Sequence, residues 1–291
     1  MSAATLEPAG SAAAPAWWPG ARQHLRWRLR RMRATLADLL GVGFTYPHPI
    51  AGRFVYHPGD YLSRRLYLYG FEEDELRFAV ECARQGGVVL DVGANIGIFT
   101  AACAHVIGDG GRVVALEPGP AFAKLKVTCA RLRLANVEPI AAAAGRTRGT
   151  ARLVAAASGR DVHHHLERSG DATGCAGITV EIVALDDLPG IDATAVTLLK
   201  IDVEGAELGV VEGASRLLRN RRVALIVEFY PAGLEAAGTS AEALWRRLTV
   251  THVCVGVRAE DGSIRPPALE SAASPGVGGT VNTLWLPAPA A

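Results

Sequence analysis

Acidic residues stand where several short apolar segments of this chain end. Asp91 follows Val88–Leu90, Glu117 follows Val113–Leu116, and Asp202 and Glu228 follow similar runs. Runs of this length and composition are typical of buried strands. In open α/β sheets, ligands bind beyond the carboxyl ends of the strands. We therefore expect these carboxylates to lie on one rim of a sheet, where they can bind a cofactor or accept a proton.

A glycine-containing turn directly follows the first of these strands. It reads Asp91-x-Gly93-x-x-x-Gly97, with Ala94 and Asn95 between the glycines. Glycine allows close approach of the backbone to a ligand, and the helix start beyond it offers unpaired N–H groups. The dinucleotide pattern G-x-G-x-x-G is absent. An acid at this strand end suits a cofactor with an amino group, such as the methionine part of S-adenosylmethionine, and Glu117 could accept hydrogen bonds from ribose.

A second group of charged residues begins at Asp202 and continues through Glu204 and Glu207. Asp202 is our first candidate for a general base, with Glu204 and Glu228 behind it. Glu204 and Glu207 could instead only complement the dipole of the following helix. The acids could also bind a divalent cation, but the sequence does not show that they converge, so no metal is assigned. The run His163–His165 is an exposed loop or a contact to substrate.

Strands and helices are expected to alternate from Val88 onward. Such alternation predicts an α/β fold with a mainly parallel sheet. A turn-rich insert at 145–183 interrupts it, and the last two extended runs could form a C-terminal antiparallel hairpin. The predicted strands are 88–92, 112–116, 137–143, 150–155, 178–183, 195–201, 222–229, 250–257 and 281–286, and the predicted helices are 71–84, 97–107, 121–134 and 205–219.

The N-terminal part of the chain has a different composition. Residues 1–20 are rich in Ala and Pro and are predicted to be a disordered tail. Residues 21–70 form an N-terminal helical extension and lead-in, with the main domain at 71–291. Leucines at steps of three and four make 21–40 an amphipathic helix with an arginine face. That helix packs on the domain, or it docks on an acidic carrier protein or an anionic membrane surface.

Charge and cysteine content restrict the class of protein. Thirty basic and 29 acidic residues nearly balance, which gives no sign of nucleic-acid binding. The first 40 residues hold six arginines and two acids. The five cysteines are scattered and never in C-x-x-C spacing, which favours reduced thiols in the cytoplasm. No apolar run is long enough to span a bilayer.

The motifs together resemble those of the FkbM-type methyltransferases. The matching segments are Leu90–Gly97, Leu116-Glu117-Pro118, Leu185–Leu188, Lys200–Glu207 and Glu212–Ala214, in that order. The resemblance runs from about residue 55 to 230. It implies a Rossmann-like class I methyltransferase fold, S-adenosylmethionine as methyl donor, and O-methylation of a hydroxyl on a sugar, glycan or secondary metabolite such as a macrolide.

The resemblance also assigns the site. Asp91, Gly93, Ala94, Asn95, Gly97, Glu117 and Pro118 would bind the cofactor. Family members commonly carry Ser-Asp after the third strand, near the adenine, where this chain has Gly145-Arg146.

Two other functions share some of these features. An NAD(P)-dependent oxidoreductase has a similar strand, turn and ribose acid, but it normally has the G-x-G-x-x-G pattern that is missing here. A noncatalytic module that keeps the cofactor site and docks partners through the arginine-rich helix is the other alternative.

Overall fold

The computed structural model describes residues 21–155, 164–167, 177–259, 263–274 and 279–289. The predicted tail 1–20, His163 and Cys175 lie outside these residues. The helices are α1 (Ala21–Leu40), α2 (Tyr61–Tyr69), α3 (Glu73–Ala83), α4 (Ile98–Ile107), α5 (Ala121–Leu132), α6 (Glu207–Gly213), α7 (Pro231–Ala236), α8 (Ala241–Thr249) and α9 (Leu269–Ala273).

The strands fall into a hairpin, a large sheet and a small sheet. They are β1 (Phe44–His48), β2 (Gly52–Tyr56), β3 (Gly87–Val92), β4 (Gly111–Leu116), β5 (Val137–Ile140), β6 (Ala143–Ala144), β7 (Gly149–Ala155), β8 (His164–Glu167), β9 (Gly177–Val183), β10 (Val196–Ile201), β11 (Ala224–Phe229), β12 (His252–Ala259), β13 (Ile264–Arg265) and β14 (Val281–Pro287).

The large sheet confirms the predicted α/β fold of Rossmann-like type. Its order is β13-β12-β14-β11-β10-β3-β4-β5, and the strands from β11 to β5 are parallel. The two late strands do pair antiparallel, as expected for the C-terminal pair. β14 does not lie at the edge, however, because it inserts between β11 and β12 and is antiparallel to both.

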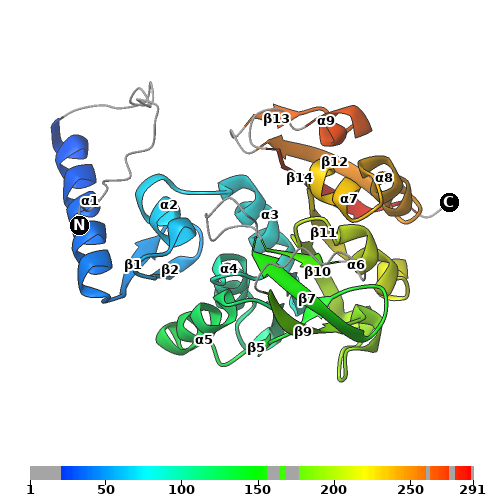
Figure 1. Cartoon of the computed structure of the whole chain (residues 1–291), viewed down its shortest axis with the longest axis horizontal. Helices are drawn as coiled ribbons and strands as arrows, with labels where there is room; N and C mark the ends of the chain where they lie inside the picture. Colours follow the sequence, from blue (N-terminus) through cyan, green and yellow to red (C-terminus); the bar gives the residue numbers. More distant parts are fainter. Residues whose placement is uncertain (1–20, 156–163, 168–176, 260–262, 275–278, 290–291) are drawn as a thin grey trace.

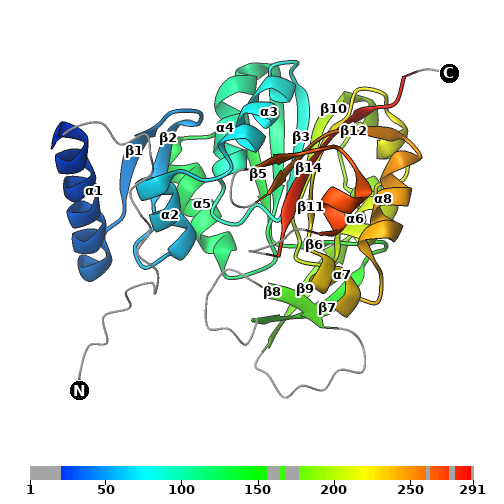
Figure 2. The same ribbon diagram turned by 90° about the horizontal axis from the view of Figure 1, so that it is seen from above.

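Helices cover both faces of this sheet (Figure 2). Neighbouring residues of a strand point to opposite faces, so Val88 and Leu90 pack in the core that contains α6 and α8. Val89 packs in the other core, with α3 and α4. Strand residues buried on both faces explain why β3, β10 and β11 are nearly continuous apolar runs in the sequence.

The insert after β5 forms the small sheet, in the order β6-β9-β7-β8. The predicted strands at 150–155 and 178–183 are confirmed as β7 and β9. Leu153, Val180 and Ala143 form its small core. This sheet lies beside the carboxyl-terminal rim of the large sheet (Figure 2).

The N-terminal extension lies at the other edge of the molecule (Figure 1). Helix α1 spans the predicted residues, but the face that packs on the protein is not the predicted leucine face. Its small residues Ala34 and Ala37 are buried, whereas the leucine stripe is exposed. Helix α2 was not predicted from the sequence; the Asp60 side chain accepts a hydrogen bond from the Ser63 N–H and caps its start.

Two further observations concern cysteines and membrane spans. Cys82, Cys103, Cys129 and Cys254 are free thiols. No helix in the described part of the chain is both long and apolar enough to cross a membrane.

Candidate functional site

A cavity of about 770 Å³ opens at the carboxyl ends of the central strands. Its size falls in the usual range for a small-molecule or cofactor site. Its walls come from the turn after β3, the ends of β4, β10 and β11, the start of α3, and the small sheet. Segments far apart in the sequence thus meet where the acids at the strand ends were expected to gather.

The turn between β3 and α4 depends on glycine at two positions. Gly93 has φ +75°, and a Cβ there would overlap the backbone carbonyl oxygen of Asp202. Gly97 has φ +89°, and a Cβ there would lie 2.7 Å from Leu125 Cδ1. Both conformations favour glycine. The absence of a side chain at Gly93 lets the turn pack directly against the segment that carries Asp202.

Glu117 holds the same turn from the neighbouring strand. Its carboxylate accepts hydrogen bonds from the backbone N–H of Asn95 at 3.0 Å and of Gly119 at 2.8 Å. Burial raises the pKa of Glu117, and these two hydrogen bonds oppose the rise. Glu117, Asn95 and Gly93 all line the cavity. The arrangement leaves a carboxylate at the rim that can still share its oxygens with a ligand.

Asp91 does not line the cavity. It is only 1 % exposed, and its carboxylate accepts a hydrogen bond from Thr100 Oγ1 at 2.5 Å. Its other oxygen lies 3.7 Å from Lys200 Nζ. Asp91 therefore supports the turn from beneath.

Lys200 joins the two halves of the site. Its Nζ donates a hydrogen bond to the Gly93 carbonyl oxygen at 2.8 Å and lies 3.0 Å from an oxygen of Asp202. Burial alone would lower the pKa of this ammonium group, but the carboxylates of Asp202 and Asp91 raise it. The lysine therefore stays charged and fixes the turn relative to the acids.

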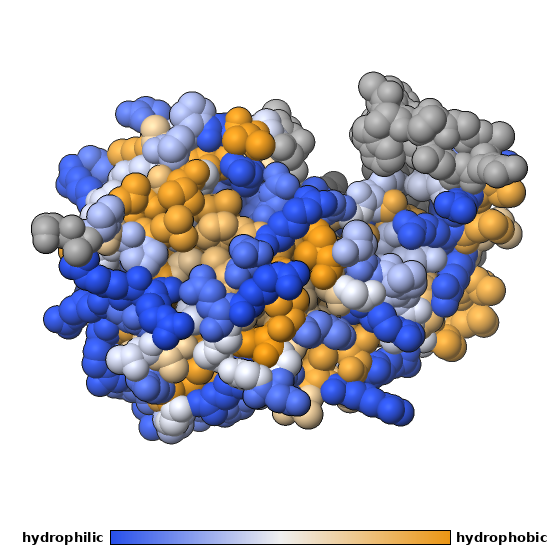
Figure 3. Space-filling view, turned by 180° about the vertical axis from the view of Figure 1, so that it is seen from behind, coloured by the Kyte–Doolittle hydropathy of each residue, from blue (hydrophilic) through white to orange (hydrophobic). Residues whose placement is uncertain are grey.

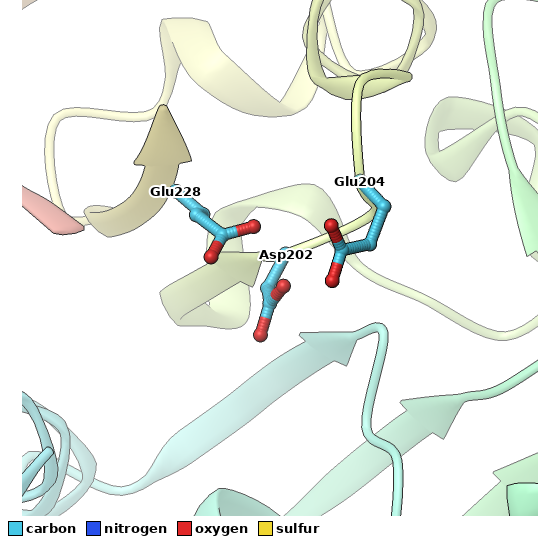
Figure 4. Close-up of side chains that lie close together, drawn as sticks. All are labelled: Asp202, Glu204 and Glu228. Carbon is cyan, nitrogen blue, oxygen red and sulfur yellow. The ribbon is translucent and has the colours of Figure 1, made fainter. Parts of the chain in front are cut away.

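Asp202, Glu204 and Glu228 converge at one point of the cavity. One carboxylate oxygen from each lies within 4.8 Å of the others. Figure 4 shows the three side chains pointing toward one another, from the end of β10, the loop after it, and β11. Burial raises the pKa of Glu228 well above its ordinary value, and the nearby Asp202 and Glu204 raise it further. The three candidate bases thus form one acidic cluster.

Further acids surround this cluster. Glu207, at the start of α6, is fully buried, and burial raises its pKa to about 8. It accepts a hydrogen bond from the Gly205 N–H at 2.8 Å. Glu72, on the cavity wall, also has its pKa raised to about 8, by burial and by Asp202. Carboxyl groups are therefore concentrated at this end of the cavity, and Glu207 and Glu72 are largely protonated at neutral pH.

The predicted site residues divide into two groups. Ala94 and Gly97, like Asp91, are not among the residues that line the cavity. Gly145 and Arg146 also lie away from it: Gly145 packs against Gly213, and Arg146 pairs with Glu212 at 2.6 Å. The predicted residues that do line it are Gly93, Asn95, Glu117, Pro118, Asp202, Glu204 and Glu228.

Several wall residues were not predicted from the sequence. The far wall carries Tyr61, Tyr69 and Phe71 together with Arg65 and Arg258. These residues come from the lead-in segment and from β12; the predicted strand at 250–257 ends one residue before Arg258, and no pattern in either segment indicates which side chains face a ligand. Lys200 did have a signal, since a lysine inside an apolar strand requires a partner.

Comparison with known proteins identifies the domain type. The family model described as the methyltransferase FkbM domain matches residues 91–252. No curated protein matches the chain with significant similarity.

Solved structures give more distant likenesses. A methyltransferase FkbM from Methylobacillus flagellatus KT is 16 % identical over 89 % of this chain and 60 % of its own, with a TM-score of 0.43. A putative rRNA methylase from Clostridium thermocellum is 12 % identical over 75 % and 96 %, with a TM-score of 0.47. An O-methyltransferase from Bacillus cereus in complex with SAH is 13 % identical over 92 % and 93 %, with a TM-score of 0.41. This chain thus spans less than two thirds of the Methylobacillus protein.

Proposed function

The chain belongs to the FkbM methyltransferase family, because the family model covers more than half of it, and on this premise we propose that it is an S-adenosylmethionine-dependent O-methyltransferase. The observation that carries the proposal is that the glycine turn and the acidic cluster face one cavity. The turn and Glu117 would bind the methyl donor. The acidic cluster lies where an acceptor hydroxyl would approach.

The reaction is a direct displacement. The acceptor oxygen attacks the sulfonium methyl carbon, a C–O bond forms, and the C–S bond breaks with its electron pair going to sulfur. The hydroxyl proton passes to a carboxylate of the cluster. Glu228 suits this role because its raised pKa makes it a stronger base than an ordinary carboxylate. Asp202, held by Lys200, is the other candidate.

The far wall supports a small-molecule acceptor. Tyr61 and Tyr69 are 50 % and 69 % exposed, so their rings are available to stack on a sugar or a macrolide-like scaffold. Arg65 and Arg258 on the same wall can donate hydrogen bonds to hydroxyl or carbonyl groups. We therefore place the acceptor, a sugar, glycan or secondary metabolite, between this wall and the acidic cluster.

The test is methyl transfer from S-adenosylmethionine labelled in its methyl group to a panel of sugars, glycosides and macrolides. We expect one S-adenosylhomocysteine for each methyl ether formed. Glu228→Gln, or Asp202→Asn if Asp202 is the base, should lower the rate about 10²–10⁴-fold, the usual contribution of a general base. Methyl groups found only on nitrogen or carbon, or undiminished rates in both Glu228→Gln and Asp202→Asn, would contradict the proposal.

A further inference from the structure

The acidic cluster brings three carboxyl groups close together at one point of the cavity. Asp202, Glu204 and Glu228 face one another, and Lys200 contacts Asp202 alone among these three. Like charges at such distances repel strongly inside a protein. A buried arrangement of this kind persists when a proton or a cation is shared among the carboxylates.

Glu228 gives a second, independent indication of a ligand. Its side chain is 9 % exposed, and Oε2 is buried without a hydrogen-bond partner among the described residues. A buried polar atom without a partner costs about 1–3 kcal/mol. In Figure 4 its carboxylate points toward Asp202 and Glu204. A group bound between the three side chains would satisfy this oxygen.

The donor set and the spacing fit a hard divalent cation. Mg²⁺ and Mn²⁺ prefer carboxylate oxygens, and ligands on opposite sides of Mg²⁺ lie about 4.2 Å apart. Ligands on adjacent corners lie about 3 Å apart. The three carboxylate oxygens lie within 4.8 Å of one another, so the side chains would draw closer together around a bound ion. The cluster also lines the cavity, so water or an acceptor oxygen can complete the coordination.

We propose that Asp202, Glu204 and Glu228 bind one divalent cation of the Mg²⁺ or Mn²⁺ class next to the acceptor hydroxyl. This inference rests on the proposed function and deepens it. The cation would orient the acceptor oxygen and favour its ionised form. Each carboxylate keeps a second oxygen that can take the acceptor's proton.

Calorimetric titration of the chelator-treated full chain with MnCl₂ and MgCl₂ tests the proposal. We expect one Mn²⁺ per chain and at least a tenfold loss of affinity in Glu228→Gln. Glu204→Gln, on a partly exposed loop, should show the same loss and guards against misfolding of the buried variant. Glu242→Gln, an exposed acid on α8 paired with Arg246, is the matched control and should bind like the unaltered chain.

Titration of the same samples with S-adenosylhomocysteine separates the two proposals. Cofactor binding without any Mn²⁺ or Mg²⁺ binding would overturn the cation site and leave the methyltransferase proposal standing. Cation binding that Glu228→Gln and Glu204→Gln leave unchanged would also overturn it. A third outcome is that Glu228→Gln lowers the affinity for S-adenosylmethionine while neither the variant nor the unaltered chain binds Mn²⁺. The positively charged sulfonium group would then be the cation that these acids contact, and the metal site would be wrong.

A different observation concerns the outer face of α1. Leu25, Leu29, Met32, Leu36 and Leu39 are 54–80 % exposed, and their spacing places them on one face of the helix. The stripe is about 21 Å long at 1.5 Å per residue. In Figure 3, hydrophobic side chains follow the edge of the molecule where α1 lies, with hydrophilic ones beside them. A surface of this kind is typical of an interaction site.

Charge restricts what this stripe can bind. Helical geometry places Arg26 and Arg33 along one side of the stripe and Arg28 and Arg31 along the other. The acid of this helix, Asp38, is already bonded to Arg64 at 2.7 Å and to Tyr56. Two copies of α1 would bring like charges together, so a second copy of this chain is disfavoured.

We infer that α1 adsorbs to a lipid surface with anionic headgroups. An apolar stripe with arginines on both sides matches such a surface, with the leucines toward the acyl chains and the guanidinium groups of Arg26, Arg28 and Arg31 at the phosphates. The Arg33 guanidinium group lies over the Phe44 ring instead. The small residues Ala34 and Ala37 hold the opposite side of the helix against the protein.

Co-sedimentation with vesicles tests this second inference. We expect binding to phosphatidylglycerol-containing vesicles, weakened by salt, and at least tenfold weaker binding by Leu29→Glu/Met32→Glu. Ile264→Glu, which alters an equally exposed apolar residue on β13, should bind like the unaltered chain. Absence of binding, or equal binding by Leu29→Glu/Met32→Glu, would overturn the inference in favour of an acidic protein partner.

Discussion

Lys200→Met is expected to lower the free energy of unfolding by about 3–5 kcal/mol, the usual effect of removing one partner of a buried ion pair. The lysine is 5 % exposed and lies between Asp91 and Asp202. Without it, Asp91, which is 1 % exposed, would keep a charge with no positive partner nearby. Urea unfolding followed by circular dichroism measures the change.

A double variant separates this cause from a packing defect. Asp91→Asn/Lys200→Met removes both charges, so it should recover a large part of the lost stability. Lys126→Met, an exposed lysine on α5, is the matched control and should change stability by less than about 0.5 kcal/mol. A Lys200→Met protein as stable as the Lys126→Met protein would contradict the proposed role of Lys200.

Gly93→Ala is expected to lower the affinity for S-adenosylhomocysteine about 100-fold. The new Cβ would overlap the Asp202 carbonyl oxygen, so the turn or the acid-bearing segment must move. Loss of two hydrogen bonds of about 1–1.5 kcal/mol each gives an effect of this size. Calorimetric titration measures it.

Gly52→Ala provides the control for backbone strain. Gly52 has φ +67°, close to the +75° of Gly93, but a Cβ there meets no atom within 4 Å. Gly52→Ala should therefore cost about 1–2 kcal/mol of stability through its conformation and leave cofactor affinity unchanged. Equal losses of affinity in the two variants would show that the contact with Asp202 has no special role.

The central sheet could be predicted because its strands are buried on both faces. β3, β10 and β11 are nearly continuous apolar runs, interrupted only near their carboxyl ends by Asp91, Lys200 and Glu228 and, in β10, by the buried Thr197. The position of β14 could not be predicted, because alternation along the chain does not determine which strands pair. The short helices α7 and α8 were also not predicted. They have six and nine residues, which is too short for a clear helical period in the sequence.

The exposed face of α1 shows a limit of hydrophobic periodicity. The pattern correctly predicted a helix at 21–40, but it does not say which face the protein covers. Here Ala34 and Ala37 allow close packing, while arginine side chains lie over aromatic rings, as Arg33 does over Phe44 at 3.7 Å. The leucines are left exposed.

The site was predictable in its main elements and less so in its details. Acids at the ends of parallel strands must share one edge of the sheet, so the common edge of Asp202 and Glu228 was predicted from the strand pattern. Their approach to within 4.8 Å was not predicted. The burial of Asp91 outside the cavity could not be predicted, because an acid near the end of a strand can face either the ligand or the core. The aromatic and arginine wall comes mainly from α2 and β12, and the sequence pattern does not determine where these elements lie relative to the central strands.

Titration of the purified chain with S-adenosylmethionine, S-adenosylhomocysteine, NAD⁺ and NADH tests the central claim most directly. We predict one site that binds both sulfur compounds and neither nicotinamide nucleotide, and that Glu117→Ala weakens, since Glu117 supports the turn and faces the ligand. Binding of NAD⁺ or NADH alone, or of none of the four, would contradict the assignment of this cavity to a methyl donor.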